Sequence, residues 1–388
     1  MACPPTPTRR GMLAGGLALG LSACAARARL DARTPMPGVD ARLRRAVSQH
    51  ETPGVVCAVG HGGAVVHRAV YGLRALIPHH EAMTWNTMFD MASLTKALIT
   101  APAIMQLWER GLVGLDVPVC HYLPEFAANG KSAITIRHLL THYSGLPPDL
   151  DLTAPWQGAA EGRRLTLSAL PDHPPGQGFV YSDINYLALG FVVEKLTAQP
   201  LATYATDAIL RPMGLAQSCF LPRPALASRI APTQMDENGH MLRGVVHDPT
   251  TRRMGGVAGH AGLFSTADDL CRYAQALLDR RAGRPGTPFA LRQDTVVLMT
   301  TPQQPAGKTD LRGLGWDIAT HYSSARGGRF PAGSFGHTGF TGTSLWIDPQ
   351  SDSYVLILTN RVHPDGRGNV VALRRDVATA AATALLDG

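Results

Sequence analysis

The chain has 388 residues, 45% of them hydrophobic, so it is long enough to bury a large core and to form two or three domains. Its net charge of +7 is modest for this length, and its arginines lie singly or in pairs, without a basic run or an aromatic-interleaved patch. Nucleic-acid binding is therefore not indicated. Only four of the 36 basic residues are lysines, so a lysine in an apolar setting calls for an explanation.

The N-terminus carries the features of an export signal. Arg9 and Arg10 precede an apolar run, Met12 to Leu21, which is of signal-peptide length and too short to span a bilayer. The arginine pair resembles a twin-arginine signal, and Leu21-Ser22-Ala23-Cys24 resembles a bacterial lipoprotein processing box. We predict a signal peptide over 1–23, lipidation of Cys24 and a tether over 24–38, with plain cleavage near Ala23 as the alternative. The protein is then periplasmic or anchored to the membrane by its lipid.

The next elements are a helix and a hairpin. Residues 39–50 have helical spacing of apolar side chains. Two β-branched runs, 54–59 and 64–71, flank a glycine-rich link at 60–63 and predict an antiparallel hairpin.

From Ser93 the pattern becomes helical, and that helix ends at Gly111. Further helices are predicted at 136–142, 159–170, 184–196 and 266–280, followed by strands at 314–318, 342–347 and 354–359 and a closing helix at 369–386.

Strands near both ends with helices between them predict an α+β fold. We expect an antiparallel sheet flanked by helices, built from 39–92 and 295–388, and an inserted, mostly helical domain over 93–294.

Four cysteines follow Cys24: Cys57, Cys120, Cys219 and Cys271. Their spacing matches neither a zinc site nor a redox motif, so we expect no metal and no cofactor. Burial as small hydrophobic residues and a disulfide among them are both compatible with the pattern.

Ser93 and Lys96 are the first candidate catalytic pair. A helix that begins near Ser93 brings Lys96 to the same face one turn later. A serine hydroxyl needs a base to become a good nucleophile, and a desolvated lysine can serve because burial disfavours its charged form. The alternative is that Ser93 caps the helix and Lys96 is solvated.

Two further stretches carry chemistry. Tyr181 and Asp183 stand two residues apart before a buried helix, where a phenol can move protons and a carboxylate can orient a lysine; the alternative is that Ser182 or Asp183 only caps that helix. The glycine-rich segment 333–342, which contains His337, Thr338, Gly339 and Phe340, precedes a strand and offers backbone N–H groups to an oxyanion.

Ser93-x-x-Lys96, Tyr181-Ser182-Asp183 and His337-Thr338-Gly339, in this order, resemble the serine β-lactamase and penicillin-binding protein superfamily, closest to its class C-like branch. The segments 135–142, 255–266 and 313–316 also resemble that branch, so the similarity runs from about residue 40 to 380.

The resemblance implies a role for each residue. Ser93 is the acylated nucleophile, Lys96 its base partner, and Tyr181 exchanges protons with the nucleophile and the leaving group. Asp183 bonds Lys96 or substrate, His337 and Thr338 contact the substrate carboxylate or Tyr181, and the oxyanion lies between the N–H groups of Ser93 and Phe340. The fold implied is a sheet with helices on both faces plus a helical domain, with the cleft between them.

Two positions depart from the commoner pattern. Asp183 replaces an asparagine, and an ionised carboxylate only accepts hydrogen bonds. His337 replaces the lysine of many β-lactamases, so near neutral pH a fixed positive charge is lost unless the histidine is protonated. Both changes occur in esterase-like and peptidase-like members, and they count against efficient β-lactam hydrolysis.

We therefore expect an exported serine hydrolase that forms an acyl-enzyme on amide or ester bonds, with peptidoglycan peptides favoured because the segment around His247-Asp248 and 255–266 resembles D-alanyl-D-alanine carboxypeptidases. A β-lactamase and a small-ester esterase are alternatives of the same class. An alternative of another class is a catalytically weak sensor that binds penicillins or muropeptides. The sequence does not specify an oligomeric state.

Overall fold

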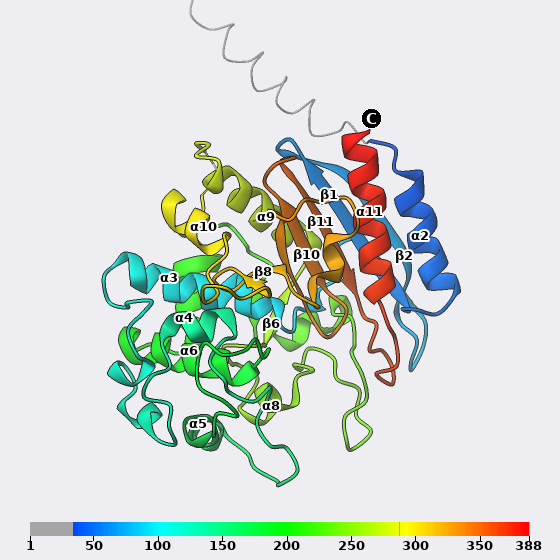
Figure 1. Cartoon of the computed structure of the whole chain (residues 1–388). Helices are drawn as coiled ribbons and strands as arrows, with labels where there is room; N and C mark the ends of the chain where they lie inside the picture. Colours follow the sequence, from blue (N-terminus) through cyan, green and yellow to red (C-terminus); the bar gives the residue numbers. More distant parts are fainter. Residues whose placement is uncertain (1–33, 287, 388) are drawn as a thin grey trace, which may run out of the picture.

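The computed structural model describes residues 34–286 and 288–387. In this range the chain forms an antiparallel eight-stranded sheet with helices on both faces, beside a largely helical part (Figure 1). The predicted α+β class with an antiparallel sheet is confirmed. The predicted signal peptide, the lipidation site Cys24 and most of the tether lie outside the described residues.

The sheet joins strands from the two ends of the described chain. Strand β1 pairs with β2 in the predicted hairpin and with β11 on its other side, Val55 opposite Thr359. The strand order is β3 (Glu81–Ala82), β2 (Ala64–Ala75), β1 (Gly54–His61), β11 (Ser353–Thr359), β10 (Ser344–Asp348), β9 (Phe335–Thr338), β8 (Asp317–Ala319) and β7 (Leu311–Arg312).

Both faces of the central strands are buried. Alternate residues of β1 enter different cores: Val55, Cys57 and Val59 pack with α2 (Pro37–Ser48) and α11 (Val371–Leu386), whereas Val56 and Ala58 face the larger core that includes α9 (Ala267–Arg281). A strand covered on both faces reads as a continuous apolar run, which explains the pattern at 54–59. Figure 1 shows α2 and α11 side by side on one face of the sheet.

The helical part surrounds the buried helix α6. It comprises η2 (Lys96–Thr100), α3 (Ala101–Glu109), η3 (Val119–His121), η4 (Pro124–Ala127), α4 (Ile136–Thr141), α5 (Ala159–Ser168), α6 (Asp183–Thr197), α7 (Leu201–Ala205), η5 (Thr206–Leu210), η6 (Pro224–Arg229), α8 (Pro249–Arg253) and α10 (Gln293–Met299). A small sheet, β4 (Phe89–Asp90), β6 (Leu263–Ser265) and β5 (Cys219–Phe220), lies against it, and η7 (Ser323–Arg326) precedes β9. Ten consecutive residues of α6, from Ile184 to Val193, are buried, as its apolar sequence predicts.

Several boundaries differ from the sequence predictions. Helix α2 begins at Pro37, inside the predicted tether, because proline is well accommodated in the first turn of a helix. The strand expected over 314–318 begins only at Asp317, and β9 occupies the middle of the glycine-rich segment 333–342, which we expected to precede a strand. Helices α7, α8 and α10 were not predicted, since five to seven residues hold too few turns to show a period.

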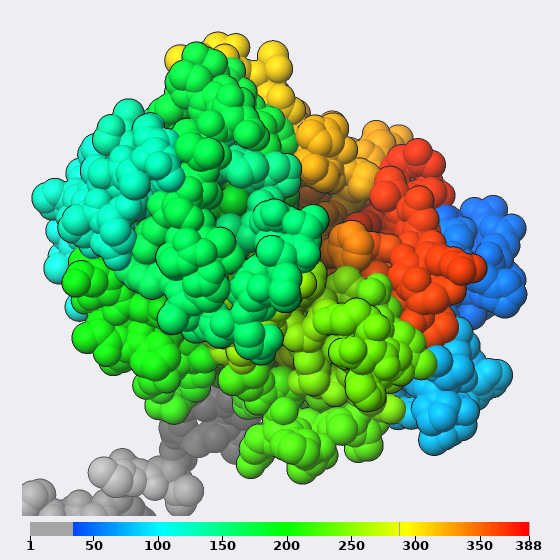
Figure 2. All heavy atoms as spheres, turned by 90° about the horizontal axis from the view of Figure 1, so that it is seen from below, coloured from blue at the N-terminus to red at the C-terminus, as the bar shows by residue number. Residues whose placement is uncertain are grey.

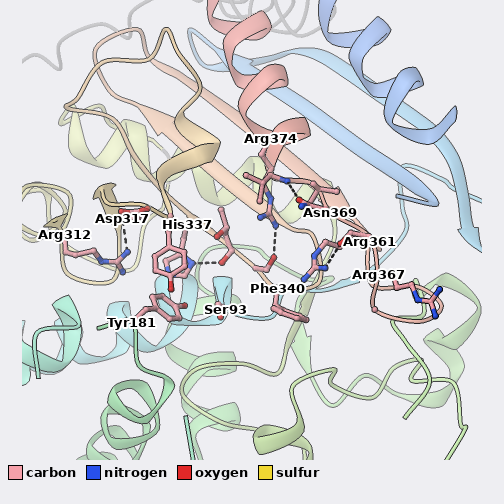
Figure 3. A pocket seen from close by; sticks show the side chains of 17 residues that line it. Ser93, Tyr181, Arg312, Asp317, His337, Phe340, Arg361, Arg367, Asn369 and Arg374 are labelled. Carbon is pink, nitrogen blue, oxygen red and sulfur yellow. Dashed lines mark hydrogen bonds and ion pairs between the residues drawn. The ribbon is translucent and has the colours of Figure 1, made fainter. Parts of the chain in front are cut away.

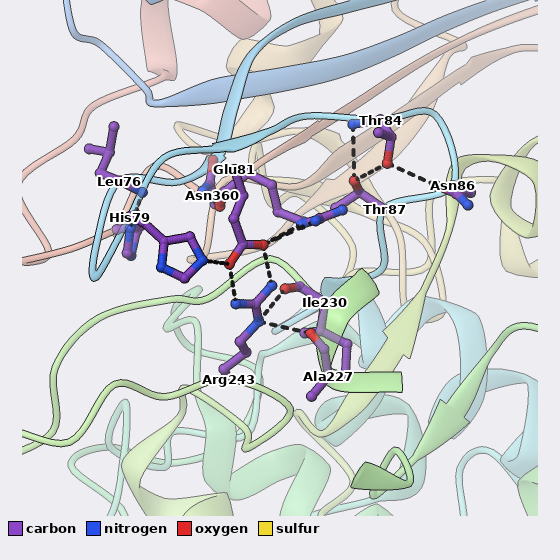
Figure 4. Close-up of polar contacts among 12 residues, drawn as sticks. Leu76, His79, Glu81, Thr84, Asn86, Thr87, Ala227, Ile230, Arg243 and Asn360 are labelled. Atoms are coloured by element: carbon purple, nitrogen blue, oxygen red, sulfur yellow. Dashed lines mark hydrogen bonds and ion pairs between the residues drawn. The ribbon is translucent and has the colours of Figure 1, made fainter. Parts of the chain in front are cut away.

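A cluster of ion pairs around Glu81, in the edge strand β3, links the sheet to the segment that precedes α8. The carboxylate of Glu81 accepts two hydrogen bonds from Arg243, at 2.7 and 2.6 Å, and one from Arg74 Nη2 at 3.0 Å (Figure 4). Arg243 Nε also donates to the carbonyls of Ala227 and Ile230. Hydrogen bonding to Arg243, opposed by desolvation, lowers the pKa of Glu81 to about 2.

All four cysteines that follow Cys24 are free thiols in the described chain, with Cys57 and Cys271 buried. Of the two compatible readings, the disulfide is thus not formed here. Among the described helices, none combines the length and the apolar character that crossing a bilayer requires.

Candidate active site

Ser93 lies in a tight turn between strand β4 and the first helix of the helical part. Ala92 has φ of 45°, a left-handed conformation that is uncommon without glycine, and the buried carboxylate of Asp90 accepts its N–H at 2.8 Å. The chain then enters the π-helical turn η2 and continues as α3. Such π-bulges occur frequently at functional sites. The turn thus presents the Ser93 side chain at the start of the helix, where the sequence predicts it.

Lys96 lies one turn further on and is fully buried. Its Nζ donates to Ser93 Oγ at 2.9 Å and to the carbonyl of His260 at 3.2 Å, and it lies 2.7 Å from Asp183 Oδ1. It also lies 5.0 Å from the centre of the Tyr181 ring. Lys96 therefore contacts Ser93, Asp183 and Tyr181, the residues that the sequence predicts around it, and the alternative that Lys96 is a solvated helix residue is wrong.

The charge state of Lys96 differs from the sequence expectation. Burial by itself lowers the pKa of Lys96, but the charges of Asp183 and Tyr181 outweigh it, so the pKa lies above its usual value. The expectation that burial leaves a neutral amine is wrong because the same burial strengthens the attraction to a carboxylate 2.7 Å away. Lys96 is an ammonium in this arrangement.

Strand β9 and the turn after it form the opposite wall. Gly339 approaches the nucleophile segment so closely that a Cβ there would lie 2.5 Å from the carbonyl oxygen of Met91. The hydroxyls of Thr341 and Thr343 donate to the carbonyls of Asp90, at 2.7 Å, and Met91, at 3.1 Å. These contacts fix β9 against the turn that carries Ser93, and they explain the glycine at this position.

His337 is buried and neutral. Burial, followed by the charges of Arg312 and Lys96, lowers the pKa of His337 well below its usual value. Its Nδ1 lies 2.9 Å from the carbonyl of Thr338, which can only accept, so Nδ1 carries the proton. Nε2 has no partner among the described residues and is left as an acceptor. His337 therefore does not replace the positive charge of the lysine found in many β-lactamases.

The amides expected to hold the oxyanion are free. Across the residues that the structure describes, neither Ser93 N–H nor Phe340 N–H donates to a protein acceptor. Phe340 itself is 60% exposed at the cavity rim, between the ring of His247 and the guanidinium of Arg361. Two unpaired N–H groups beside a nucleophile suit the stabilisation of a tetrahedral intermediate.

Ser93 opens into a cavity of about 530 Å3 between the helical part and the sheet. Figure 2 shows the surface hollowed where the green helical segments meet the orange and red C-terminal segments. Tyr181, His337, Thr338, Gly339 and Phe340 line the same cavity, so the structure brings together the residues that three distant motifs supplied (Figure 3). Lys96 and Asp183 are not among the lining residues; the buried Lys96 contacts both Ser93 and Asp183.

Sequence reasoning missed the arginines of this cavity. Four line it, Arg312, Arg361, Arg367 and Arg374, against a single acidic residue, Asp317. Arg312 is only 1% exposed; its Nη1 lies 3.7 Å from Asp317 Oδ1, whereas its Nε and Nη2 have no hydrogen-bond partner among the described residues. Figure 3 shows Arg312 on the Tyr181 and His337 side of Ser93, with Arg361 and Arg367 beyond Phe340. The excess of positive side chains makes the cavity favourable for an anion.

Behind Lys96 lies a second charged pair. His260 Nε2 is 2.8 Å from Asp248 Oδ1; burial lowers the pKa of His260, but Asp248 and Asp183 raise it by more. Asp183, Asp248 and His260 each offer one ligand atom within 4.8 Å of the others, which is the geometry of a metal cluster. However, the Lys96 ammonium already neutralises Asp183, and the raised pKa of His260 opposes metal binding, which needs a neutral ring. The cluster therefore fits a charge network better than a metal site.

A family model described as Beta-lactamase matches residues 39–380. Curated relatives include a protein of Escherichia coli (strain K12) named "Putative D-alanyl-D-alanine carboxypeptidase", which is 31% identical over 350 residues covering 80% of this chain and 79% of that protein. A protein of the same name from Salmonella schwarzengrund (strain CVM19633) is 33% identical over 327 residues, with 76% and 74% covered.

Solved structures agree on the fold. A penicillin-binding protein homologue from Caulobacter crescentus superposes with a TM-score of 0.71 at 20% identity, covering 91% of this chain and 98% of that one. A class C beta-lactamase gives 0.70 at 19% identity, with 91% and 95% covered. EstCE1, a hydrolase with promiscuous acyltransferase activity, gives 0.70 at 22% identity, with 89% and 98% covered.

Proposed function

The chain belongs to the beta-lactamase family and is a serine hydrolase; from this premise we propose that it is exported and cleaves the terminal amide of D-alanyl-D-alanine peptides of peptidoglycan through an acyl-enzyme on Ser93. The names of the curated relatives support this substrate class. The predicted signal peptide supports export, because the substrate lies outside the cytoplasm.

The observation that carries the proposal is the buried guanidinium of Arg312 in the cavity of Ser93: its Nη1 lies 3.7 Å from Asp317 Oδ1, but its Nε and Nη2 have no hydrogen-bond partner among the described residues. A buried guanidinium with free donors is costly unless a ligand pairs with it, and a carboxylate is the acceptor that matches its fork geometry. A D-alanyl-D-alanine peptide ends in a carboxylate next to its scissile amide. An uncharged short ester offers no such group, so the cavity favours the peptide over the esterase alternative.

In the proposed reaction, Tyr181 carries the proton between Ser93, the leaving amine and water. Ser93 Oγ attacks the carbonyl carbon, and Tyr181, which faces the Lys96 ammonium, acts as the general base that takes its proton. The oxyanion receives hydrogen bonds from the N–H groups of Ser93 and Phe340. Collapse breaks the C–N bond, Tyr181 protonates the leaving amine, and an acyl-enzyme remains. Water then attacks the ester carbon and gives a proton to Tyr181. The C–O bond to Ser93 breaks, Tyr181 returns that proton to Ser93 Oγ, and the acid is released.

A substrate panel tests the proposal. One preparation is assayed for D-alanine release from a diacyl-lysyl-D-alanyl-D-alanine peptide, for nitrocefin hydrolysis and for hydrolysis of a short-chain nitrophenyl ester, each with Ser93→Ala as the control. We expect D-alanine release that Ser93→Ala abolishes. Turnover of nitrocefin alone or of the ester alone would instead identify a β-lactamase or an esterase. Stoichiometric acylation by a fluorescent penicillin without turnover of any substrate would identify a binding sensor.

Export is tested separately, by cell fractionation. Replacing Arg9 and Arg10 by lysines should retain the protein in the cytoplasm if the twin-arginine reading is correct. Cys24→Ser should release it from the membrane fraction if Cys24 carries the lipid. Unchanged fractionation of either variant would contradict the corresponding part of the proposal.

A further inference from the structure

His142 holds both neighbours of Tyr181 in the chain. Its carbonyl oxygen accepts the N–H of Val180 at 3.0 Å, and its ring Nδ1 accepts the N–H of Ser182 at 3.1 Å. One residue from the end of α4 thus fixes the backbone before and after the tyrosine. Because residues 180–182 belong to no helix or strand, these two bonds replace the pairing that regular structure would give.

The His142 ring also supports the Tyr181 ring itself. The two rings stack with centroids 4.4 Å apart and planes 29° apart. His142 is completely buried, so little room is left for the ring to turn. The stacked ring restricts the side chain of Tyr181, and the two hydrogen bonds restrict the backbone on either side of it. Both constraints come from His142.

The protonation state of His142 is determined by its partners. Nδ1 also lies 3.1 Å from Asn185 Nδ2, and the Asn185 amide is oriented by Ser144 Oγ, which donates to its oxygen at 2.6 Å. Two donors converge on Nδ1, so the proton is on Nε2. Burial, followed by the charges of Arg312 and Lys96, lowers the pKa of His142 well below its usual value. A neutral ring next to Tyr181 leaves the Lys96 ammonium as the charge that the phenol faces.

The backbone of His142 is in the region where glycine is usual. It has φ of 61° at the residue after α4, a position that many helices give to glycine. A left-handed backbone is less favourable for histidine than for glycine, so the cost has to be offset by contacts of the side chain. The His142 side chain makes such contacts with the Tyr181 ring and the Ser182 N–H.

We propose that His142 is a positioning residue that holds the Tyr181 phenol at Ser93 during acylation; this rests on the proposed acyl-enzyme mechanism. Removing it leaves binding intact and slows the chemical step. A misplacement of about 1 Å in such a group costs roughly 100-fold in rate, so we expect a loss of about 10- to 100-fold in kcat with little change in KM.

Two variants distinguish a loss of Tyr181 positioning from a general loss of folding. His142→Gly suits the left-handed backbone and removes the ring, whereas His142→Asn tolerates the same backbone and keeps a side-chain oxygen that accepts from Ser182. We expect His142→Asn to recover part of the activity lost in His142→Gly. Tyr143→Phe is the matched control: it alters the neighbouring buried residue, whose hydroxyl donates to the carbonyl of Asp310 at 2.9 Å, and should leave kcat within about twofold.

A double-mutant cycle gives the decisive readout. Single-turnover acylation by a penicillin is followed by mass spectrometry over hours, so that very slow variants remain measurable. In a Tyr181→Phe background His142→Gly should cause no further loss, because the group that it positions is gone. Equal losses in both backgrounds, or a loss confined to KM, would overturn the proposal.

A spectroscopic measurement keeps the inference independent of the reaction. With ring-labelled tyrosine the nine tyrosines are resolved by NMR, and Tyr181 is assigned from Tyr181→Phe. The signal of Tyr181 should shift and broaden in His142→Gly and not in Tyr143→Phe. An unchanged signal would overturn the positioning role, whereas failure of every probe to acylate the wild type would instead contradict the proposed function.

Discussion

The carboxylate of Asp183 lies 2.7 Å from Nζ of Lys96, and this pair sets the charge next to the nucleophile. Asp183→Asn removes the carboxylate, and burial then lowers the pKa of Lys96. If Lys96 acts as an ammonium that faces Tyr181, the alkaline limb of the pH profile of kcat/KM should move to lower pH by roughly one to three units.

The control for this measurement is Asp151→Asn, an aspartate whose carboxylate bonds the exposed Thr153. It should leave the profile in place. Movement of the acid limb in Asp183→Asn, with activity gained at low pH, would show instead that neutral Lys96 is the base.

Arg312 is expected to determine the preference for substrates that carry a carboxylate. Arg312→Gln should raise KM for a D-alanyl-D-alanine peptide by about 10- to 100-fold, since a charge-assisted hydrogen bond contributes about 1.5–3 kcal/mol. The peptide amide analogue, which lacks the carboxylate, should show no such change. Arg164→Gln removes an exposed arginine paired with Glu161 and serves as control. An equal effect on both substrates would contradict carboxylate recognition.

His337 should contribute no pH dependence to substrate binding near neutrality. Because the pKa of His337 lies well below its usual value, the ring stays neutral from pH 6 to 8. The ratio of KM values for the carboxylate substrate and its uncharged analogue should therefore be constant over this range in steady-state assays. A ratio that rises with pH would mean that a protonated His337 binds the carboxylate.

Glu81 should stabilise the fold in a pH-dependent manner. Its pKa is lowered to about 2 in the folded chain, against about 4.3 when unfolded. The contribution is therefore complete above about pH 4.3 and is lost as the pH falls towards 2. Glu81→Gln should lower the melting temperature by roughly 2–6 °C at pH 7, and the difference from wild type should shrink below pH 4.

An exposed ion pair provides the comparison in the same thermal melts. Glu161→Gln breaks the surface pair with Arg164 and should change the melting temperature by less than about 1 °C. A Glu81→Gln difference that persists at pH 2 would show that the Arg243 contact is not the cause.

The sequence predicts well those elements in which a periodic pattern of apolar residues extends over several repeats or in which the apolar run is continuous. The hairpin β1–β2, the helices α6, α9 and α11 and the strands β10 and β11 lie where the patterns place them, within a few residues. Strand β9 does not show in the pattern, because Gly336 and His337 carry no strand propensity and the strand is defined by its partner β10.

The sequence predicts only part of the site, for a similar reason. Short motifs whose residue types indicate their chemistry contain Ser93, Lys96, Tyr181 and His337. Arg312 does not belong to such a motif, because one of 32 arginines becomes notable only when the structure shows it buried in the cavity with two guanidinium nitrogens that lack a hydrogen-bond partner among the described residues. The charge of Lys96 also depends on geometry. The sequence predicts that Lys96 is buried, but only the structure shows that its Nζ lies 2.7 Å from Asp183 Oδ1.

The pairing of β1 with β11 has a consequence for how the protein is made. Val55 meets Thr359 in the centre of the sheet, so the hairpin that leaves the ribosome first has an open side until the last strand has been synthesised. Through most of translation that apolar side is free to pair with other chains. Synthesis that stops before Ser353 should therefore yield an insoluble product, however complete the segment that carries the nucleophile.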